Sequence, residues 1–124
     1  MKLFLLIGLA GATGALSRYA LQGLVAERAL SAFPYGTFAI NIVGSFLLGF
    51  FATAGFQRFM VNPEYRTALT VGFLGAFTTF SSWSYETLQL FGGGSFTLAA
   101  VNAFGSMLAG LIAVWLGSLV GRVL

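Results

Sequence analysis

The sequence predicts an all-α membrane protein of four hydrophobic helices, because its composition excludes a water-exposed surface and its apolar residues fall into four long runs. Of 124 residues, 58% are hydrophobic and only 7% are charged, whereas a typical soluble domain carries about 25% charged residues. So few charged side chains cannot cover a surface that faces water. We therefore expect one multi-pass domain, residues 1–124, in the cell membrane.

The four expected helices follow from the lengths of the apolar runs. A membrane-spanning helix needs about 20 mostly apolar residues, and the qualifying segments are 3–26, 36–59, 67–91 and 96–120. Asn62-Pro63 is a turn signal before the third, and Gly92–Gly94 makes a flexible joint before the fourth. Residues 2–15 also imitate a signal peptide, but the apolar run continues to Ala26, which favours a spanning helix.

The charged and reactive side chains exclude several functional classes. The chain has no His, Cys or Asp, so we expect neither the usual metal-ligand cluster nor a nucleophile with an adjacent base, and hence no enzyme. Its six cations are scattered singly, which argues against nucleic acid. With four spans, one side holds Lys2, Arg58, Arg66 and Arg122 and the other Arg28. This bias favours cytoplasmic termini, although insertion in both orientations stays open because the number of charges is small.

Small residues recur at the spacing that lets membrane helices pack closely. Gly117-x-x-x-Gly121, Ser45-x-x-x-Gly49 and Gly11-x-x-x-Ala15 are such motifs. Packing within one subunit is the simpler explanation for each motif alone. Because several helices carry them, and because a pore within four helices would be narrow, we expect at least a dimer.

Two helices carry stripes of neutral polar residues. Thr37, Asn41 and Ser45 recur at every fourth position of the second helix, and Asn102 and Ser106 repeat that spacing in the fourth. Hydrogen bonds between helices are one explanation. The other is a lining for a small ion that must exchange water for protein donors.

The third segment combines glycines, hydroxyls and aromatic rings between residues 72 and 86, where helix propensity is poor. We expect a break near Gly75–Thr79, which would free carbonyls on one half-helix and amides on the next. Phe80 and Trp83 would then share one face of the second half-helix. Aromatic ring edges carry partial positive charge and could face an anion, although ordinary packing is the alternative.

Two charged residues lie inside expected spans, where charge is costly. Arg18 could neutralise carbonyls, pair with Glu86, concentrate anions at a vestibule, or extend to the interface. Glu86 could carry a proton in a coupled carrier or act as a structural hydrogen-bond acceptor.

The ordered motifs of the first three helices resemble those of the Fluc (CrcB) fluoride ion channel family over essentially the whole chain. They are Gly11-x-x-Gly14-Ala-x-x-Arg18-Tyr19, Gly36-Thr37-Phe-x-x-Asn41-x-x-Gly44-Ser45, and Gly72-Phe-Leu-Gly75-x-Phe-Thr78-Thr79-Phe80-Ser81 continuing to Glu86. Each motif alone is weak, but together and in this order they are specific.

The resemblance implies an antiparallel, dual-topology homodimer with two pores, which passively exports fluoride across the cell inner membrane and confers fluoride resistance. It also implies a structural sodium ion at the dimer centre, bound by backbone carbonyls that by position belong to Gly75 and Thr78. Membrane lipid and a second copy are the other partners. The expected pore residues are Thr37, Asn41, Phe80, Ser81, Trp83, Ser84, Asn102 and Ser106.

Two features depart from the family pattern, and two rival functions stay open. Trp83 stands where the family typically has Phe, which adds bulk and an N–H donor that could hold fluoride itself. The four-to-one cation bias is unusual for a dual-topology chain. The rivals are a proton-coupled small-ion or small-molecule carrier using Glu86, and a membrane scaffold that transports nothing.

Overall fold

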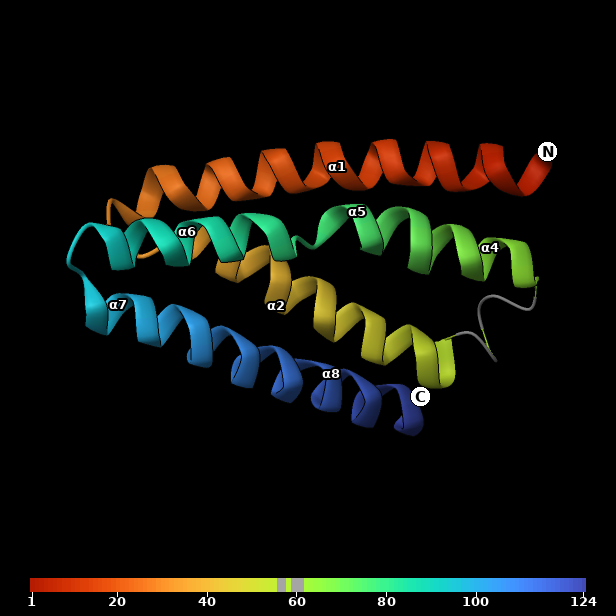
Figure 1. The fold of residues 1–124 in the computed structure, drawn as a ribbon. Coiled ribbons are helices and arrows are strands. Elements are labelled where there is room, and N and C mark those ends of the chain that lie inside the picture. The colour runs from red at the N-terminus through yellow and green to blue at the C-terminus, as the bar shows by residue number, and fades with distance from the viewer. Residues whose placement is uncertain (56–57, 59–61) are drawn as a thin grey trace.

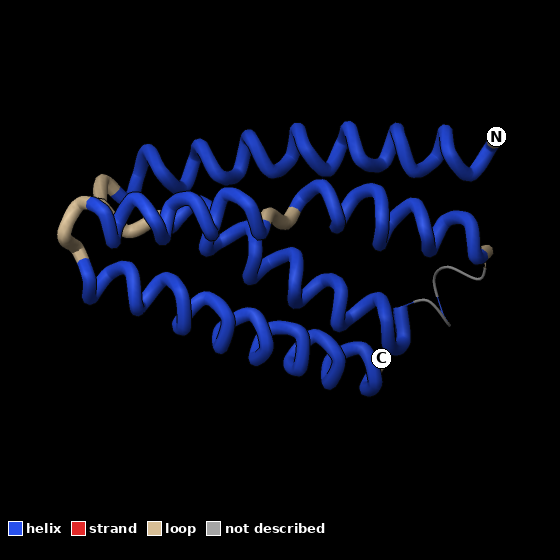
Figure 2. The backbone as a smooth tube through the Cα atoms, viewed as in Figure 1, coloured by secondary structure: helices blue, strands red, loops and turns tan. Residues whose placement is uncertain are grey.

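The computed structural model describes residues 1–55, 58 and 62–124, and every regular element in that part of the chain is a helix (Figure 2). The predicted all-α class is therefore confirmed. The parts of the predicted helix 36–59 that fall on residues 56–57 and 59 lie outside the described residues.

The first two helices are joined by a short turn. Helix α1 covers Lys2–Ala29 and ends at Leu30, which adopts the left-handed conformation with φ 43°. Helix α2 covers Tyr35–Phe50 directly after Pro34 and continues as the π-helix η1, Phe51–Gly55. Helix α1 is longer than the predicted 3–26, because its C-terminal residues, although more polar, keep helical geometry until the turn.

The third segment is assembled from several pieces. Helix α4 covers Pro63–Thr67, and the Asn62 side chain caps it by accepting the Glu64 N–H. It continues as the π-helix η2, Ala68–Leu74, and the short helix α5, Gly75–Phe77. After an interruption at Thr78 and Thr79, helix α6 covers Phe80–Gly92. Gly94 then makes the turn with φ 83°, a conformation that glycine adopts without steric cost.

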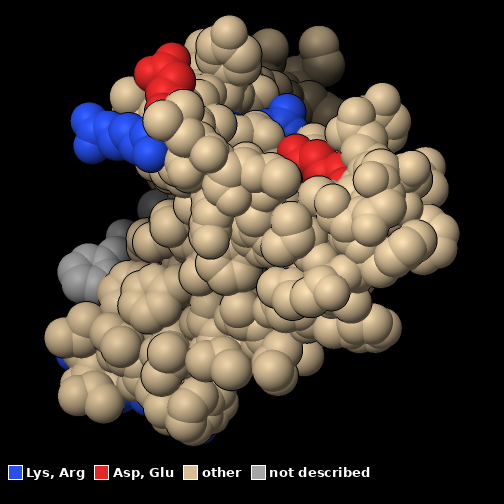
Figure 3. Space-filling model, turned by 90° about the vertical axis from the view of Figure 1, so that its left-hand side faces the viewer, with Lys and Arg blue, Asp and Glu red and all other residues tan. Residues whose placement is uncertain are grey.

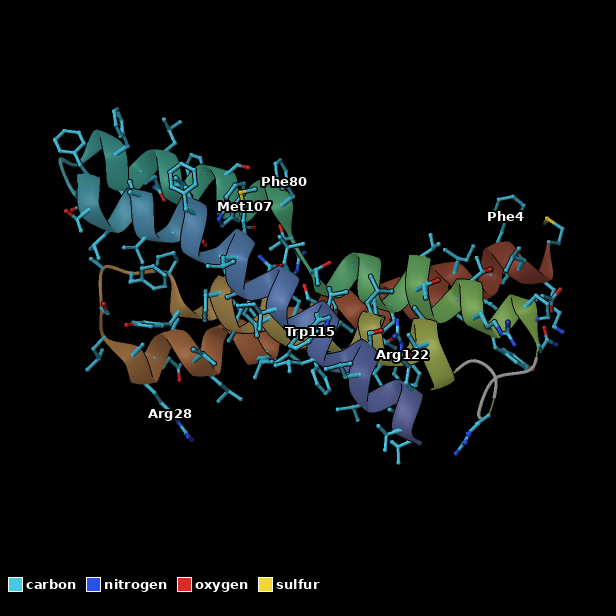
Figure 4. All side chains as sticks on the ribbon, turned by 90° about the horizontal axis from the view of Figure 1, so that it is seen from below. Phe4, Arg28, Phe80, Met107, Trp115 and Arg122 are labelled. Carbon is cyan, nitrogen blue, oxygen red and sulfur yellow. The ribbon has the colours of Figure 1, made fainter. Side chains whose placement is uncertain are left out.

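The fourth segment starts with α7, Phe96–Ala100, passes through the π-helix η3, Val101–Gly105, and ends with α8, Ser106–Val123. In Figure 1, helix α1 runs beside α5, α2 packs against α8, and both chain termini lie at the same end. Arg28 and Arg122 lie at opposite ends of the bundle (Figure 4).

Three helices of the described chain are long and apolar enough to cross a membrane: Lys2–Ala29, Tyr35–Thr53 and Phe96–Val123. The predicted span 67–91 is not among them as a single helix, because the interruption at Thr78 and Thr79 divides it. The face in Figure 3 is formed mostly by uncharged residues. These features support the multi-pass membrane protein that composition predicted.

Glycines bring the helices into backbone contact within the chain. A Cβ atom on Gly49 would clash with the Val114 carbonyl, and one on Gly117 with the Phe46 carbonyl, so α2 and α8 meet at these two positions. Gly14 is equally close to the backbone of Phe73. These glycines therefore let helices pack closely inside one subunit, so they do not by themselves indicate a dimer.

Candidate functional site

The interruption of the third segment is held open by one side chain of α2. Thr78 and Thr79 have extended backbone angles, with ψ 154° and 116°. The Asn41 carboxamide pairs with both backbone groups of Thr79. Its Nδ2 donates to the Thr79 carbonyl at 3.1 Å, and its Oδ1 accepts the Thr79 N–H at 2.8 Å. Asn41 thus supplies hydrogen bonds that a continuous helix would have supplied itself.

This arrangement releases backbone carbonyls at the end of α5, including those of Gly75 and Thr78. In a continuous α-helix the Thr79 N–H would donate to Gly75 and the Ser82 N–H to Thr78. Here the Thr79 N–H donates to Asn41, and the Ser82 N–H donates to the Thr79 hydroxyl at 3.2 Å. The carbonyls of Gly75 and Thr78 therefore lose their helical donors. The resemblance implied a structural sodium ion at these same two positions, and that ion stays a prediction.

A groove of ≈540 Å³ runs along this interruption, between α2, the third segment and α8. All of its lining residues are uncharged. Six of the residues predicted from the sequence contribute to the lining: Asn41, Gly75, Thr78, Phe80, Trp83 and Ser106. Figure 4 shows Phe80, at the start of α6, on the same side of the molecule as Met107, another lining residue.

Phe80 and Trp83 form an aromatic pair at the start of α6. Their ring centroids lie 5.1 Å apart, with the planes tilted by 44°. Phe80 is 78% exposed in the single chain, and Trp83 is half-buried. The spacing of three residues does place both rings on one face of α6, next to the groove. Ordinary core packing does not account for Phe80, because most of its surface is uncovered.

The other predicted pore residues lie outside the groove lining. Asn102 is fully buried, and its Nδ2 donates to the Thr87 hydroxyl at 2.8 Å. The Ser84 hydroxyl donates to the Phe80 carbonyl at 2.9 Å, and the exposed Ser81 lies 3.3 Å from the Thr79 hydroxyl. Their part in a pore stays a prediction.

Thr37 and Glu86 meet at a second, smaller cavity of ≈160 Å³ beneath the α1–α2 turn. The buried Thr37 hydroxyl donates to Glu86 Oε1 at 2.7 Å and accepts from Gln22 Nε2 at 2.8 Å. Because Gln22 fills the acceptor role of the hydroxyl, the Thr37 proton points to Glu86. The other Glu86 oxygen, Oε2, is buried without a hydrogen-bond partner.

Arg18 does not pair with Glu86. Both residues belong to the described chain, and no ion pair joins them there, whereas Lys2 pairs with Glu64 at 2.9 Å. Arg18 is half-buried on α1. The carboxylate instead takes its hydrogen bond from Thr37, so this chain does not form the ion pair that was one alternative for Arg18, and a vestibule role for Arg18 stays a prediction.

Three residues important to this geometry were not predicted from the sequence as site residues: Gln22, Thr79 and Thr87. Thr79 could have been found, because a hydroxyl residue directly before a helix is a common N-cap. Thr87 lies four residues after Trp83, and its hydroxyl also donates to the Trp83 carbonyl at 2.7 Å. Gln22 gave no signal, since a single amide in an apolar helix does not indicate its partner.

Comparison with known proteins places this arrangement in a family. The family model for CrcB-like protein, Camphor Resistance (CrcB), matches residues 5–118. The fluoride-specific ion channel FluC of Geotalea daltonii is 45% identical over 122 residues, covering 98% of each chain. The protein of that name from Geotalea uraniireducens is 45% identical over 124 residues, which are all of both chains. The one from Opitutus terrae is 48% identical over 119 residues, covering 94% of this chain and 90% of the relative. The chain therefore belongs to the CrcB-like family.

Proposed function

We propose that this chain is a fluoride-selective, passive ion channel that exports fluoride across the cell inner membrane. Its relatives are named fluoride-specific ion channels. The observation that carries the proposal is the uncharged groove, in which an aromatic pair lies beside amide and hydroxyl groups. A small anion loses its hydration there against neutral donors and ring edges, which bind it without the tight hold of a fixed cation.

We propose that two copies assemble in antiparallel orientation and enclose two pores. In one chain the groove is open on one side, and beside it Phe80, Met107 and Leu111 are exposed. If lipid covered this face, the released carbonyls of Gly75 and Thr78 would be left without water or protein partners, which is costly inside a bilayer. A second copy covering the same face would bury these groups and turn the open groove into a closed pathway.

We also propose that the released carbonyls of Gly75 and Thr78 hold a structural sodium ion between the two copies. Carbonyl oxygens are hard ligands of the kind that alkali and alkaline-earth cations prefer. Both residues line the groove on the face assigned to the dimer, and neither carbonyl receives its helical hydrogen bond. The residues therefore fit a sodium ion, which when bound would hold the two chains together by electrostatic attraction.

The relatives are named ion channels, which does not favour the proton-coupled carrier, and an ion channel is not an enzyme. The one feature in favour of a carrier is the unpartnered Oε2 of Glu86. A scaffold without transport would not need an uncharged groove that is continuous with a broken helix. Passive conduction thus accounts for more of the structure than either rival.

The test uses purified protein in liposomes loaded with equal potassium fluoride and potassium chloride. We expect valinomycin to release fluoride while chloride stays inside, with protein-free liposomes as the control. Equal release of both halides would contradict selectivity, and no release would contradict the channel. A pH gradient imposed without a fluoride gradient distinguishes the channel from the proton-coupled carrier, because concentrative fluoride uptake would show coupling to protons.

A further inference from the structure

Trp83 is the residue at which the site departs from an all-phenylalanine pair, and its indole N–H is already used. Nε1 donates to the backbone carbonyl of Asn102 at 2.8 Å, joining α6 to η3. We propose that Trp83 serves the fluoride pathway as an arene only: its N–H is a fixed anchor to Asn102, and fluoride meets ring carbons. This inference rests on the proposed function, which it makes more specific.

The direction of the N–H bond follows from which residues line the groove. Trp83 is a lining residue, whereas Asn102 is fully buried and lies outside the lining. The N–H edge of the indole therefore points out of the groove and into the protein. The part of the ring left at the groove consists of carbon atoms, next to the Phe80 ring at 5.1 Å.

The acceptor is held rigidly in place. The Asn102 side chain donates to Thr87 at 2.8 Å and accepts from the Ser106 hydroxyl at 3.1 Å. Its backbone carbonyl also accepts the Ser106 N–H at the end of η3. A carbonyl oxygen has two lone pairs, so the Trp83 N–H takes the second one. Trp83 is further tied through the Thr87 hydroxyl, which donates to its carbonyl.

The anchored indole has a consequence that phenylalanine could not provide. A phenyl ring has no donor, so only packing would fix its orientation, whereas the N–H bond fixes the rotation of the indole about its side-chain torsions. The hydrogen bond from the Trp83 N–H to Asn102 thus holds the indole ring in place and sets its tilt relative to the Phe80 ring. Fluoride could reach the N–H only by displacing a buried hydrogen bond, which is unfavourable.

Nuclear magnetic resonance of the indole N–H tests this directly. The chain has two tryptophans, so Trp115→Phe leaves Trp83 as the single ¹⁵N-indole signal in nanodiscs. We expect a signal that stays protected from solvent exchange when sodium fluoride replaces sodium chloride. Loss of this protection with fluoride would overturn the proposal, as would rapid exchange with solvent in chloride alone. Fluoride flux of the same variant is measured separately, so that absent flux would count against the proposed function alone.

Two substitutions at position 83 give an independent readout. Trp83→Phe keeps an arene and removes the donor, so the variant should keep fluoride-over-chloride selectivity, lose less flux than Trp83→Leu, and melt at a lower temperature. Trp83→Leu removes the arene, and flux should fall about tenfold, the change that corresponds to losing about 1.4 kcal/mol of ring-edge interaction. Loss of flux in a folded Trp83→Phe variant, equal to that of Trp83→Leu, would show that the N–H is needed by the ion.

Discussion

The Asn41 carboxamide and the Thr79 backbone form a two-point hydrogen-bonded pair, at 3.1 and 2.8 Å, across the interruption of the third segment. A side-chain amide has the same donor and acceptor groups as a peptide unit. Asn41 can therefore replace backbone partners that Thr79 loses by leaving the helix. The site is thus built on a backbone irregularity in which a neighbouring helix satisfies the polar groups of Thr79.

Asn41→Leu should destabilise the protein by about 1–3 kcal/mol for each backbone group left without a partner. Leucine has the same branching of heavy atoms but neither hydrogen-bonding group, and Thr79 is only 6% exposed, so water cannot substitute. Thermal unfolding in detergent measures the change.

The matched control for Asn41 is Ser45→Ala, one turn further along α2. Within the described chain the Ser45 side chain forms no hydrogen bond, so its loss should change the melting temperature little. Equal melting temperatures for the two variants would contradict the assignment of Asn41 as the residue that stabilises the interruption.

Gly49→Ala should separate α2 from α8 and destabilise the fold by about 1–3 kcal/mol, the usual cost of overpacking. The added methyl group would meet the Val114 backbone carbonyl, which cannot rotate away as a flexible side chain could. Gly23→Ala is the matched control, because nothing lies within 4 Å of the position its Cβ would occupy. Thermal unfolding of both variants checks the prediction. Alanine has the higher helix propensity at both positions, so a Gly23 variant as unstable as the Gly49 variant would contradict the close contact as the cause.

Thr37→Val should lower both stability and fluoride flux, whereas Thr37→Ser should preserve them. Valine has the shape of threonine but no hydroxyl, so Gln22 Nε2 and Glu86 Oε1 would both lose their hydrogen-bond partner. Thr37 is only 2% exposed, so water would not replace the lost hydroxyl. Serine retains the hydroxyl that links them. Melting temperature and liposome flux together measure the effect, and a valine variant indistinguishable from wild type would show that this three-residue chain of hydrogen bonds is dispensable.

The sequence was sufficient for the helical class, the membrane location and the family, because apolar runs and ordered motifs are properties of the chain itself. It also indicated the interruption, since Gly75 to Thr79 combines poor helix formers with hydroxyl residues. The actual interruption is narrower, at Thr78 and Thr79, because Gly75 keeps helical angles within α5.

What the sequence could not provide is the direction of individual side-chain hydrogen bonds. The indole of Trp83 could have donated to an ion, and only the position of the Asn102 carbonyl at η3 shows that it does not need one. The hydrophobic periodicity does not reveal the π-helix η3. Residues 101–105 are mostly apolar, so they have no polar face whose spacing would show the change in residues per turn. Likewise, Arg18 and Glu86 are both charged, yet the fold brings Thr37 and not Arg18 to the carboxylate.

Replacing sodium by N-methylglucamine should lower the thermal stability of the dimer, if Gly75 and Thr78 bind the ion as proposed. A ligand that binds only the folded state stabilises it by about 1.4 kcal/mol for each tenfold rise in concentration above its dissociation constant. The melting temperature should therefore stay constant at sodium concentrations below the dissociation constant and rise at concentrations above it. It should rise less with potassium, whose larger radius fits a small carbonyl cage less well. The Asn41→Leu variant provides the control. Without the amide that holds the interruption open, the Gly75 carbonyl loses its fixed position, and the dependence on sodium should weaken. If the wild-type melting temperature is the same in both salts at equal ionic strength, the proposed sodium site is wrong. The fluoride pathway is tested separately by the flux measurement.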